Sequence, residues 1–378
     1  MAALPPGRAA TIPPVDRTQE GGTPLYLPKV AAQRGPGRRA RVFYNPAMGF
    51  DRDLNVAVGT ALRSTSTLAR SGWEMLGATG VRGLRLAHES SLFRELLITE
   101  REPEAVALIR RNIGETGLTE VVRAREADAR EPAVGGPFDY VDLDPYGSPV
   151  PYLDSLFGSV GDRTVIAVTA TDMMVLAGVV GGACERRYGA RPLHGRLAPE
   201  GGLRILLAYL ARRAREAGRR MVPLLCYVHD HHVRAYLELS PGPEPSADPV
   251  EEIHTNDWTG PWLGPRPTYG PLWVGPLFDP RFVDALRPPA VAASGHEVER
   301  WIERVREEAT VDRPFFYEPN ELARRLGLSE PPGVSELIDA LRAQGARAAR
   351  AHPQPSAVRT DAPRALVEEA AREGHGRR

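Results

Sequence analysis

Residues 73–100 read WEMLGATGVRGLRLAHESSLFRELLITE, and this stretch decides the fold. The apolar run Trp73–Leu76 predicts a strand, the glycines at 77, 80 and 83 predict a tight turn, and the run up to Ser90 predicts a helix. A second apolar run, Glu95–Thr99, predicts another strand and is followed by the acidic residue Glu100. A strand, a glycine-rich turn, a helix and a second strand form a βαβ unit, which is typical of nucleotide-binding folds.

The same alternation continues along the chain. Apolar periodicity predicts further helices at 52–70, 103–112 and 202–216, and further strands at 121–124, 138–143, 164–169 and 221–228. Strands that alternate with helices favour a parallel, doubly wound sheet. The predicted fold class is therefore α/β, with a Rossmann-like domain over residues 25–240.

The ends of the chain differ from this middle part. Residues 1–24 are rich in Pro, Gly and Ala and are expected to form a flexible N-terminal arm. The stretch 240–249 is dense in Pro, Ser and acidic residues and predicts a linker. Helices are predicted at 297–309, 321–326 and 334–343, so residues 250–378 are expected to form a smaller α+β C-terminal domain.

Composition restricts the classes of protein that fit. The 378 residues contain 48 Lys and Arg against 48 Asp and Glu, so a nucleic-acid site would have to be a local patch. The two cysteines, Cys184 and Cys226, are too few for a four-thiolate zinc site and indicate thiols in a reducing compartment. No apolar run approaches the roughly 20 residues of a membrane span, and a cytoplasmic location is expected.

The glycine-rich turn indicates which ligand the βαβ unit takes. It reads Gly-x-x-Gly-x-x-Gly rather than the Gly-x-Gly-x-x-Gly that seats a pyrophosphate, so it favours a ligand without phosphates, such as S-adenosyl-L-methionine. We expect Glu100 to accept hydrogen bonds from both ribose hydroxyls. After the strand at 121–124, Asp128 is expected to accept from the adenine amino group while the amide of Ala129 donates to the ring.

The motif with the most specific chemistry is YVDLDPYGSP at residues 140–149. It resembles the Asp/Asn-Pro-Pro-aromatic motif of amino-group methyltransferases. An exocyclic amino nitrogen is a poor nucleophile because its lone pair is delocalised into the ring, and acceptors that hold its hydrogens aim that lone pair. We expect Asp144 and the carbonyl of Pro145 to be these acceptors, Asp144 to take the released proton, and Tyr146 to stack on a flipped base.

The chain as a whole resembles the tRNA guanine-26 N2-dimethyltransferases over roughly residues 25–365. The resemblance is carried by ordered blocks at 42–48 (VFYNPAM), 142–149 (DLDPYGSP), 168–172 (VTATD), 184–190 (CERRYGA), 229–234 (HDHHVR) and 270–277 (GPLWVGPL). It implies a Rossmann-like S-adenosylmethionine-dependent methyltransferase domain, a C-terminal tRNA-recognition domain, and transfer of one or two methyl groups to N2 of a guanine in tRNA.

The resemblance also implies roles for individual residues. The cofactor contacts would be Arg52, Arg82, Glu100, Asp128 and Ala129, and the catalytic aspartate would be Asp144. Phe43 and Tyr146 would hold the guanine, where the family usually has phenylalanine at the second position. Some relatives bind zinc through a cysteine cluster in the second domain. This chain has no such cluster, so no metal is expected.

Two other functions stay open at this point. The Asp-Pro-Tyr chemistry also suits an amino-group methyltransferase that acts on another nucleic acid or on a protein, and an RNA-binding module without catalysis would keep the same fold. Arg347, Arg350 and Arg359 are predicted to contact tRNA phosphates, as are Arg38, Arg39 and Arg41 near Phe43. The histidines at 229, 231 and 232 are expected to lie along one strand, where at most two can face the same ligand.

Overall fold

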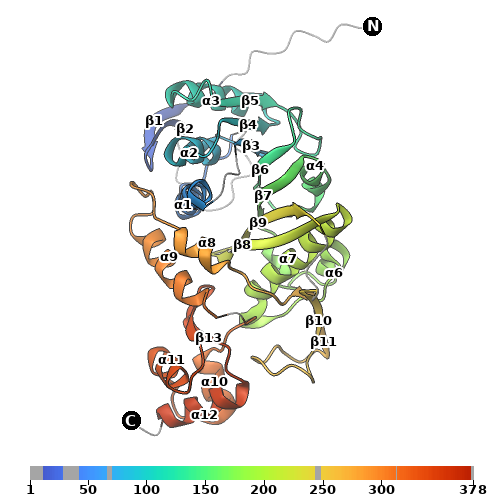
Figure 1. Ribbon diagram of the computed structural model, residues 1–378, viewed down its shortest axis with the longest axis vertical. Helices are drawn as coiled ribbons and strands as arrows, with labels where there is room; N and C mark the ends of the chain where they lie inside the picture. Colours follow the sequence, from blue (N-terminus) through green and yellow to red (C-terminus); the bar gives the residue numbers. More distant parts are fainter. Residues whose placement is uncertain (1–11, 29–41, 66–69, 243–247, 312, 376–378) are drawn as a thin grey trace. The chain divides into compact units, whose positions relative to one another are not determined.

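The computed structural model describes residues 12–28, 42–65, 70–242, 248–311 and 313–375, and the chain divides into two compact units (Figure 1). The first unit comprises Met1–Leu143, Tyr152–Gly161 and Leu286–Val298, and the second comprises Asp144–Pro151, Asp162–Ala285 and Glu299–Arg378. Among the residues described, no helix combines the length and the apolar character needed to cross a membrane.

The first unit contains the predicted βαβ unit. Its parallel strands lie in the order β5-β4-β3-β6. They are β3 (Ser71–Glu74), β4 (Glu95–Glu100), β5 (Val122–Glu126) and β6 (Phe138–Leu143). The helices of this unit are α1 (Gly49–Thr65), α2 (Val81–Ser90), α3 (Pro103–Glu115) and α4 (Leu153–Phe157). The parallel strands and the α/β class predicted here are confirmed, and β6 has the predicted bounds.

A β-hairpin precedes this parallel sheet. Strands β1 (Val15–Glu20) and β2 (Thr23–Pro28) pair in antiparallel register, and β2 lies against α2 and α3. Alternate residues of β2 are buried, with Leu25 and Leu27 no more than 5% exposed. The prediction of a flexible arm over residues 1–24 is therefore wrong for residues 15–24, because this apolar face packs on the helices. Residues 1–11 lie outside the described part of the chain.

The second unit contains antiparallel strands in the order β7-β9-β8. These are β7 (Val160–Ala170), whose first two residues belong to the first unit, β8 (Arg219–His229) and β9 (His232–Pro241). The helix α7 (Ala198–Glu216) packs on β8 and β9. The expectation of parallel pairing is wrong for these strands. The two-residue turn between β8 and β9 can join only antiparallel neighbours, and β9 also pairs antiparallel with β7 on its other side.

The same turn corrects the expected placement of the histidines. His229 ends β8 and His232 begins β9, so they lie on two paired strands rather than along one. Asp230, in the turn, has a positive φ of 45°. The rings of His229 and His232 pack edge to face with centroids 5.8 Å apart.

The rest of the second unit combines short helices with two small sheets. Three short helical segments, α5 (Met173–Leu176), α6 (Ala183–Tyr188) and η3 (Gly195–Leu197), connect β7 to α7. The later elements are β10 (Val250–His254), β11 (Thr268–Trp273), α8 (Pro280–Ala285), α9 (Glu297–Glu308), α10 (Pro319–Leu326), α11 (Val334–Ala343), β12 (Ala348–Ala351), β13 (Gln354–Thr360) and α12 (Arg364–His375). Figure 1 shows α10, α11 and α12 grouped beside β13.

An apolar core holds this C-terminal group together. It is formed by buried side chains that include Leu322, Leu337, Val358 and Val367. The helices predicted at 321–326 and 334–343 are confirmed as α10 and α11, whereas the terminal helix α12 was not predicted. The proposed division into domains at 25–240 and 250–378 stays a prediction. Strands β9 and β10, which lie on either side of that boundary, belong to one compact unit.

Candidate active site

The glycine-rich turn of the first unit lies between β3 and α2. Gly77 donates its N–H to the carbonyl of Thr99 at 2.8 Å, and Gly80, with φ of 75°, is the N-cap residue that precedes α2. A Cβ placed on Gly77 would lie 2.4 Å from a methyl carbon of Ile98, so a larger residue does not fit there. The absence of a side chain leaves the backbone of this turn close to the carboxyl end of β4.

Glu100, at the end of β4, fixes the turn. Its carboxylate accepts the amide of Ala78 at 2.8 Å and the amides of Arg101 and Glu102 at 2.6 and 3.0 Å. A carboxylate offers about four acceptor sites, so these amides take most of them. The prediction that Glu100 binds both ribose hydroxyls therefore requires a ligand to share or displace one of the amide contacts.

Asp128 and Ala129 follow β5. Asp128 accepts the backbone N–H and the guanidinium of Arg130, each at 2.9 Å, and the hydrogen bond from this guanidinium holds the pKa of Asp128 well below its usual range. The pair is on the surface, with the Asp128 side chain 23% exposed, so the ion pair contributes little to stability and can be exchanged for another donor. Ala129 is buried.

Arg52 is buried in α1 and binds Glu20 of the N-terminal hairpin. Its Nη2 lies 2.9 Å from one oxygen of Glu20, and its Nε contacts the other oxygen. It also donates to the carbonyl of Asn45 and lies over the ring of Tyr44. Burial alone raises the pKa of Glu20, but the charges of Arg52 and Arg85 and the hydrogen bonds from Arg52 and Tyr44 together outweigh this effect and lower that pKa below its ordinary value.

Glu20 belongs to a buried cluster that the sequence did not predict. Arg85 of α2 is fully buried and donates to Glu20 at 3.2 Å and to Asp53 at 2.7 Å. Asp53 also accepts the amides of Ala293 and Ser294 at 3.0 and 2.7 Å. This cluster joins the hairpin to α1, α2 and the segment Leu286–Val298 within the first unit.

Arg82 occupies the first turn of α2, one residue before Gly83. It is 7% exposed and lines a cavity of about 10 Å³ together with the carboxylates of Glu74 and Asp142. That volume holds at most one water. Arg82 is thus placed among acidic groups in the interior of the first unit.

The residues predicted to hold the target base differ in their exposure. Asp144 follows the last residue of β6 directly and is partly buried, Pro145 is buried, and Tyr146 is 65% exposed. Gly147 has φ of 98° and donates its N–H to Thr171 Oγ1 at 2.6 Å. In the first unit, Phe43 is 46% exposed. Each exposed ring offers a face on which a base can stack.

The arginines predicted to contact tRNA phosphates do not share one environment. Arg347 is 57% exposed and pairs with Asp361 at 2.8 Å, and Arg350 donates to Ser335 Oγ. Arg359 is only 2% exposed and binds Glu200 and Glu308 at 2.8 Å each. The prediction for Arg359 is therefore wrong, because its guanidinium neutralises buried carboxylates. Arg38, Arg39 and Arg41 lie outside the described residues.

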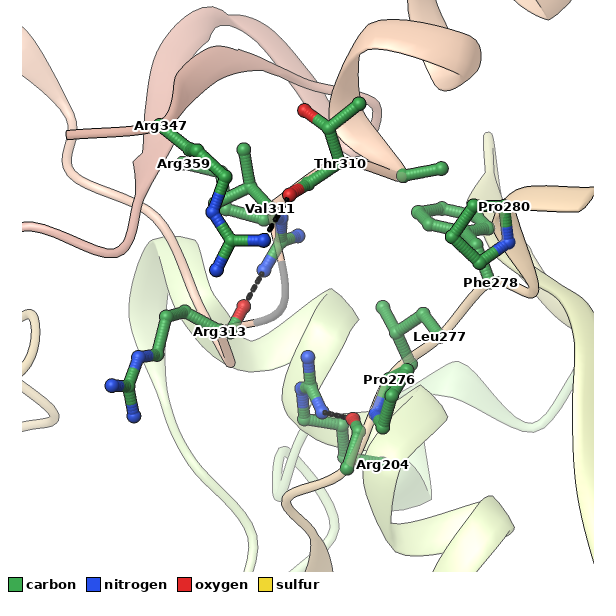
Figure 2. A pocket seen from close by; sticks show the side chains of 12 residues that line it. Arg204, Pro276, Leu277, Phe278, Pro280, Thr310, Val311, Arg313, Arg347 and Arg359 are labelled. Atoms are coloured by element: carbon green, nitrogen blue, oxygen red, sulfur yellow. Dashed lines mark hydrogen bonds between the residues drawn. The ribbon is translucent and has the colours of Figure 1, made fainter. Parts of the chain in front are cut away.

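Figure 2 shows Arg347 and Arg359 at a cavity of about 340 Å³ in the second unit. Arg359 donates to the carbonyl of Arg313 at 2.9 Å, and Arg347 donates to the carbonyl of Thr310 at 2.9 Å. On the other side, Arg204 donates to the carbonyls of Trp273 and Gly275. These donors are directed to protein acceptors, so the cavity is not arranged as a phosphate site.

The chain matches known proteins over nearly its whole length. The model of a family described as N2,N2-dimethylguanosine tRNA methyltransferase matches residues 29–256 and 263–372. A Pyrococcus horikoshii protein named tRNA (guanine(26)-N(2))-dimethyltransferase is 32% identical over 372 residues, with 91% of this chain and 95% of the relative covered. A Thermococcus kodakarensis protein of the same name is 34% identical, with 87% and 93% covered.

A solved structure agrees with these matches. It is the Trm1 protein of Pyrococcus horikoshii in complex with S-adenosyl-L-methionine, which superimposes with a TM-score of 0.79 at 30% identity and covers 94% of this chain and 99% of that one. The likeness thus extends through both compact units.

Proposed function

The chain belongs to the N2,N2-dimethylguanosine tRNA methyltransferase family, and from this premise we propose that it transfers one or two methyl groups from S-adenosyl-L-methionine to the N2 amino group of guanine 26 in tRNA. It is an S-adenosylmethionine-dependent enzyme with a Rossmann-like methyltransferase fold. Its substrate is tRNA. We place the reaction in the cytoplasm.

The observation that carries this proposal is the extent of the family match. A Rossmann-like fold alone serves many substrates, so a match confined to the glycine-rich turn would support only a cofactor. Here the match continues through residues 263–372, beyond the cofactor turn and the Asp-Pro-Tyr motif. A protein or DNA methyltransferase has no reason to share that second part, so we favour tRNA over the alternatives.

The cofactor side of the proposal uses Arg52, Arg82, Glu100, Asp128 and Ala129. The turn fits S-adenosyl-L-methionine because Gly77 lets its backbone lie close to the carboxyl end of β4, and Glu100 and Asp128 lie at the carboxyl ends of neighbouring parallel strands, at the edge where such folds bind ligands. When bound, the cofactor supplies a methyl group on a positively charged sulfur. Arg52 would bind the cofactor carboxylate in exchange for part of its contact with Glu20.

The target side uses Asp144, Pro145, Tyr146 and Phe43. Asp144 and the carbonyl of Pro145 hold the two amino hydrogens of the guanine, which directs the nitrogen lone pair toward the methyl group that is transferred. The carboxylate of Asp144 then takes the proton that the nitrogen loses on methylation. The exposed rings of Tyr146 and Phe43 are available to stack on a base that has left its helix.

Nucleoside analysis tests the proposed function directly. The full-length enzyme is incubated with S-adenosyl-L-methionine and an unmodified tRNA transcript that has guanosine at position 26, and the digested nucleosides are measured by mass spectrometry. A transcript with adenosine at position 26 is the matched control. We expect N2-methylguanosine or N2,N2-dimethylguanosine from the first transcript and background levels from the second. Equal methylation of both transcripts would contradict the proposed position.

A further inference from the structure

We propose that Tyr188 is a positioning residue for methyl transfer, which fixes the turn Asp144–Ser148 through a hydrogen-bond chain that runs from Ser148 to Asp172. This inference rests on the proposed function, since it takes Asp144 as the group that holds the target amine. All of the residues in this chain belong to the second unit.

The turn is anchored at two consecutive residues. Gly147 donates its N–H to Thr171 Oγ1 at 2.6 Å and accepts the N–H of Thr171 at 2.9 Å. The hydroxyl of Ser148 lies 2.8 Å from the hydroxyl of Tyr188 and accepts the N–H of Val150 at 3.3 Å. Thr171 and Asp172 follow β7, and Tyr188 ends α6, so these two segments hold the turn.

The direction of the hydrogen bonds follows from the groups involved. The hydroxyl of Tyr188 lies 2.9 and 3.0 Å from the two oxygens of Asp172, and a carboxylate can only accept. The single phenol proton therefore points to Asp172, and Ser148 must donate its own proton to the oxygen of Tyr188. Each hydroxyl proton therefore has one defined acceptor, and the hydroxyl of Ser148 has a single orientation.

Tyr188 is itself held firmly. Its side chain is fully buried, and its ring packs edge to face on Tyr209 with centroids 5.6 Å apart. Its backbone carbonyl accepts from Arg212 at 2.7 Å, and Arg187 donates to Asp172 at 2.7 Å. Burial raises the pKa of Tyr188, so the phenol keeps the proton that this chain requires.

The anchoring has a consequence for the reaction. Tyr146 is 65% exposed, so packing of its own side chain does not fix it, and Asp144 is partly buried two residues before it. Gly147, at φ of 98°, gives the turn a backbone freedom that other residues lack. Because an error of about 1 Å in the placement of a reacting group costs roughly 100-fold in rate, the anchors at Gly147 and Ser148 determine whether Asp144 meets its target.

The test is the substitution Tyr188→Phe, which removes one hydroxyl and keeps the ring. We expect kcat with the guanosine-26 transcript to fall by about 10- to 100-fold, in line with the cost of a misplaced group. The dissociation constant of S-adenosyl-L-methionine, measured by calorimetry, and the KM for tRNA should change by no more than about threefold. Tyr209→Phe, which alters the neighbouring ring outside the hydrogen-bond chain, should retain wild-type kcat.

A double-mutant cycle with Ser148→Ala separates positioning from general damage to the fold. If Tyr188 acts through Ser148, the double variant should lose no more activity than the more impaired single variant. The inference would be overturned if the activity losses of the two single variants multiply in the double variant, or if kcat for Tyr188→Phe stays within twofold of wild type. Asp144→Asn, assayed in parallel, distinguishes failure of the proposed function from failure of this inference. If Asp144→Asn stays active, the proposed catalytic role of Asp144 fails. If Asp144→Asn is inactive while Tyr188→Phe is fully active, only the role of Tyr188 is refuted.

Discussion

The aromatic rings assigned to the target base are exposed, whereas the residue proposed to position their turn is buried. Tyr146 and Phe43 present 65% and 46% of their surface to solvent, while Tyr188 is fully buried. A group that binds a large RNA must be reachable, and a group that positions another must not be displaced by water. Exposure therefore separates two kinds of residue that the sequence motifs do not distinguish.

At the residue scale, Glu100→Ala should weaken the binding of S-adenosyl-L-methionine by about 1.5–3 kcal/mol, because it removes charge-assisted hydrogen bonds to the ribose. The structure adds a second reason, since Glu100 also holds the amide of Ala78 in the glycine-rich turn. Isothermal titration calorimetry on the folded variant measures the effect.

The matched comparison for Glu100 is Glu100→Gln, which keeps one acceptor oxygen. It should lose less affinity than Glu100→Ala. An unchanged affinity for Glu100→Ala would move the ribose contact to another residue.

The positions of proposed site residues at strand ends could be predicted from the sequence, because the order of strand, turn and helix is a local property. Glu100 and Asp144 are examples, and both stand directly at the end of a parallel strand or after it. The environment of Arg359 could not be predicted, since its partner Glu200 lies 159 residues away. Such long-range pairing leaves no periodic signal, so a buried arginine and an RNA-facing one look alike.

At the scale of elements, the N-terminal hairpin is the main feature that the sequence analysis missed. Gly21 and Gly22 separate two short runs, and a Gly-Gly pair between such runs is a known hairpin signal. The abundance of Pro and Ala before it obscured that signal. The hairpin matters for function because Glu20 binds Arg52, a proposed cofactor contact.

The hairpin provides a stability prediction. Glu20→Ala leaves Arg52 and Arg85 buried with less compensating charge, so the free energy of unfolding of the first unit should fall by about 3–5 kcal/mol. Arg17→Ala, on the same hairpin, breaks only an exposed contact with Glu115 and should have little effect on that free energy. Urea unfolding measures both, and equal losses would contradict the buried role of Glu20.

At the scale of the whole molecule, a buried charge network joins distant parts of the second unit. Glu200 of α7 accepts from Arg204 and Arg359, and Glu308 of α9 accepts from Arg359 and the amide of His352. Burial alone raises the pKa of both glutamates, but the arginine charges, with His352 at Glu308, outweigh it and lower both values. This network ties β13 to two helices that precede it by many residues.

The lowered pKa values predict a pH dependence of stability. In the unfolded chain these glutamates take up protons near their ordinary value of 4.5, whereas in the folded state they remain ionised to lower pH. Their contribution is therefore complete above pH 4.5 and is lost as the pH falls below it. Urea unfolding between pH 7 and pH 3, run for wild type and Glu200→Gln, should give a shallower pH dependence for the variant. Equal slopes would contradict this role of Glu200.

The same network changes what is expected of the C-terminal arginines. Arg359→Ala should lower the free energy of unfolding by about 3–5 kcal/mol, because it leaves two buried carboxylates without their partner. Arg347, which is exposed, and Arg350, which is partly buried, remain the candidates for phosphate contacts. Changing both to Ala should weaken tRNA binding and reduce its dependence on salt. A salt series of tRNA affinities measures this, and an unchanged slope would exclude both residues from the tRNA interface.

The central claim is that Asp144 holds the guanine amino group and takes its proton. It is tested most directly by single-turnover methyl transfer to the guanosine-26 transcript with Asp144→Asn, which keeps the shape of the side chain and removes the carboxylate. We expect a rate at least about 100-fold below wild type, the usual contribution of a general base, with cofactor affinity within a few-fold. A rate within tenfold of wild type, about 1.4 kcal/mol in barrier height, would contradict the claim.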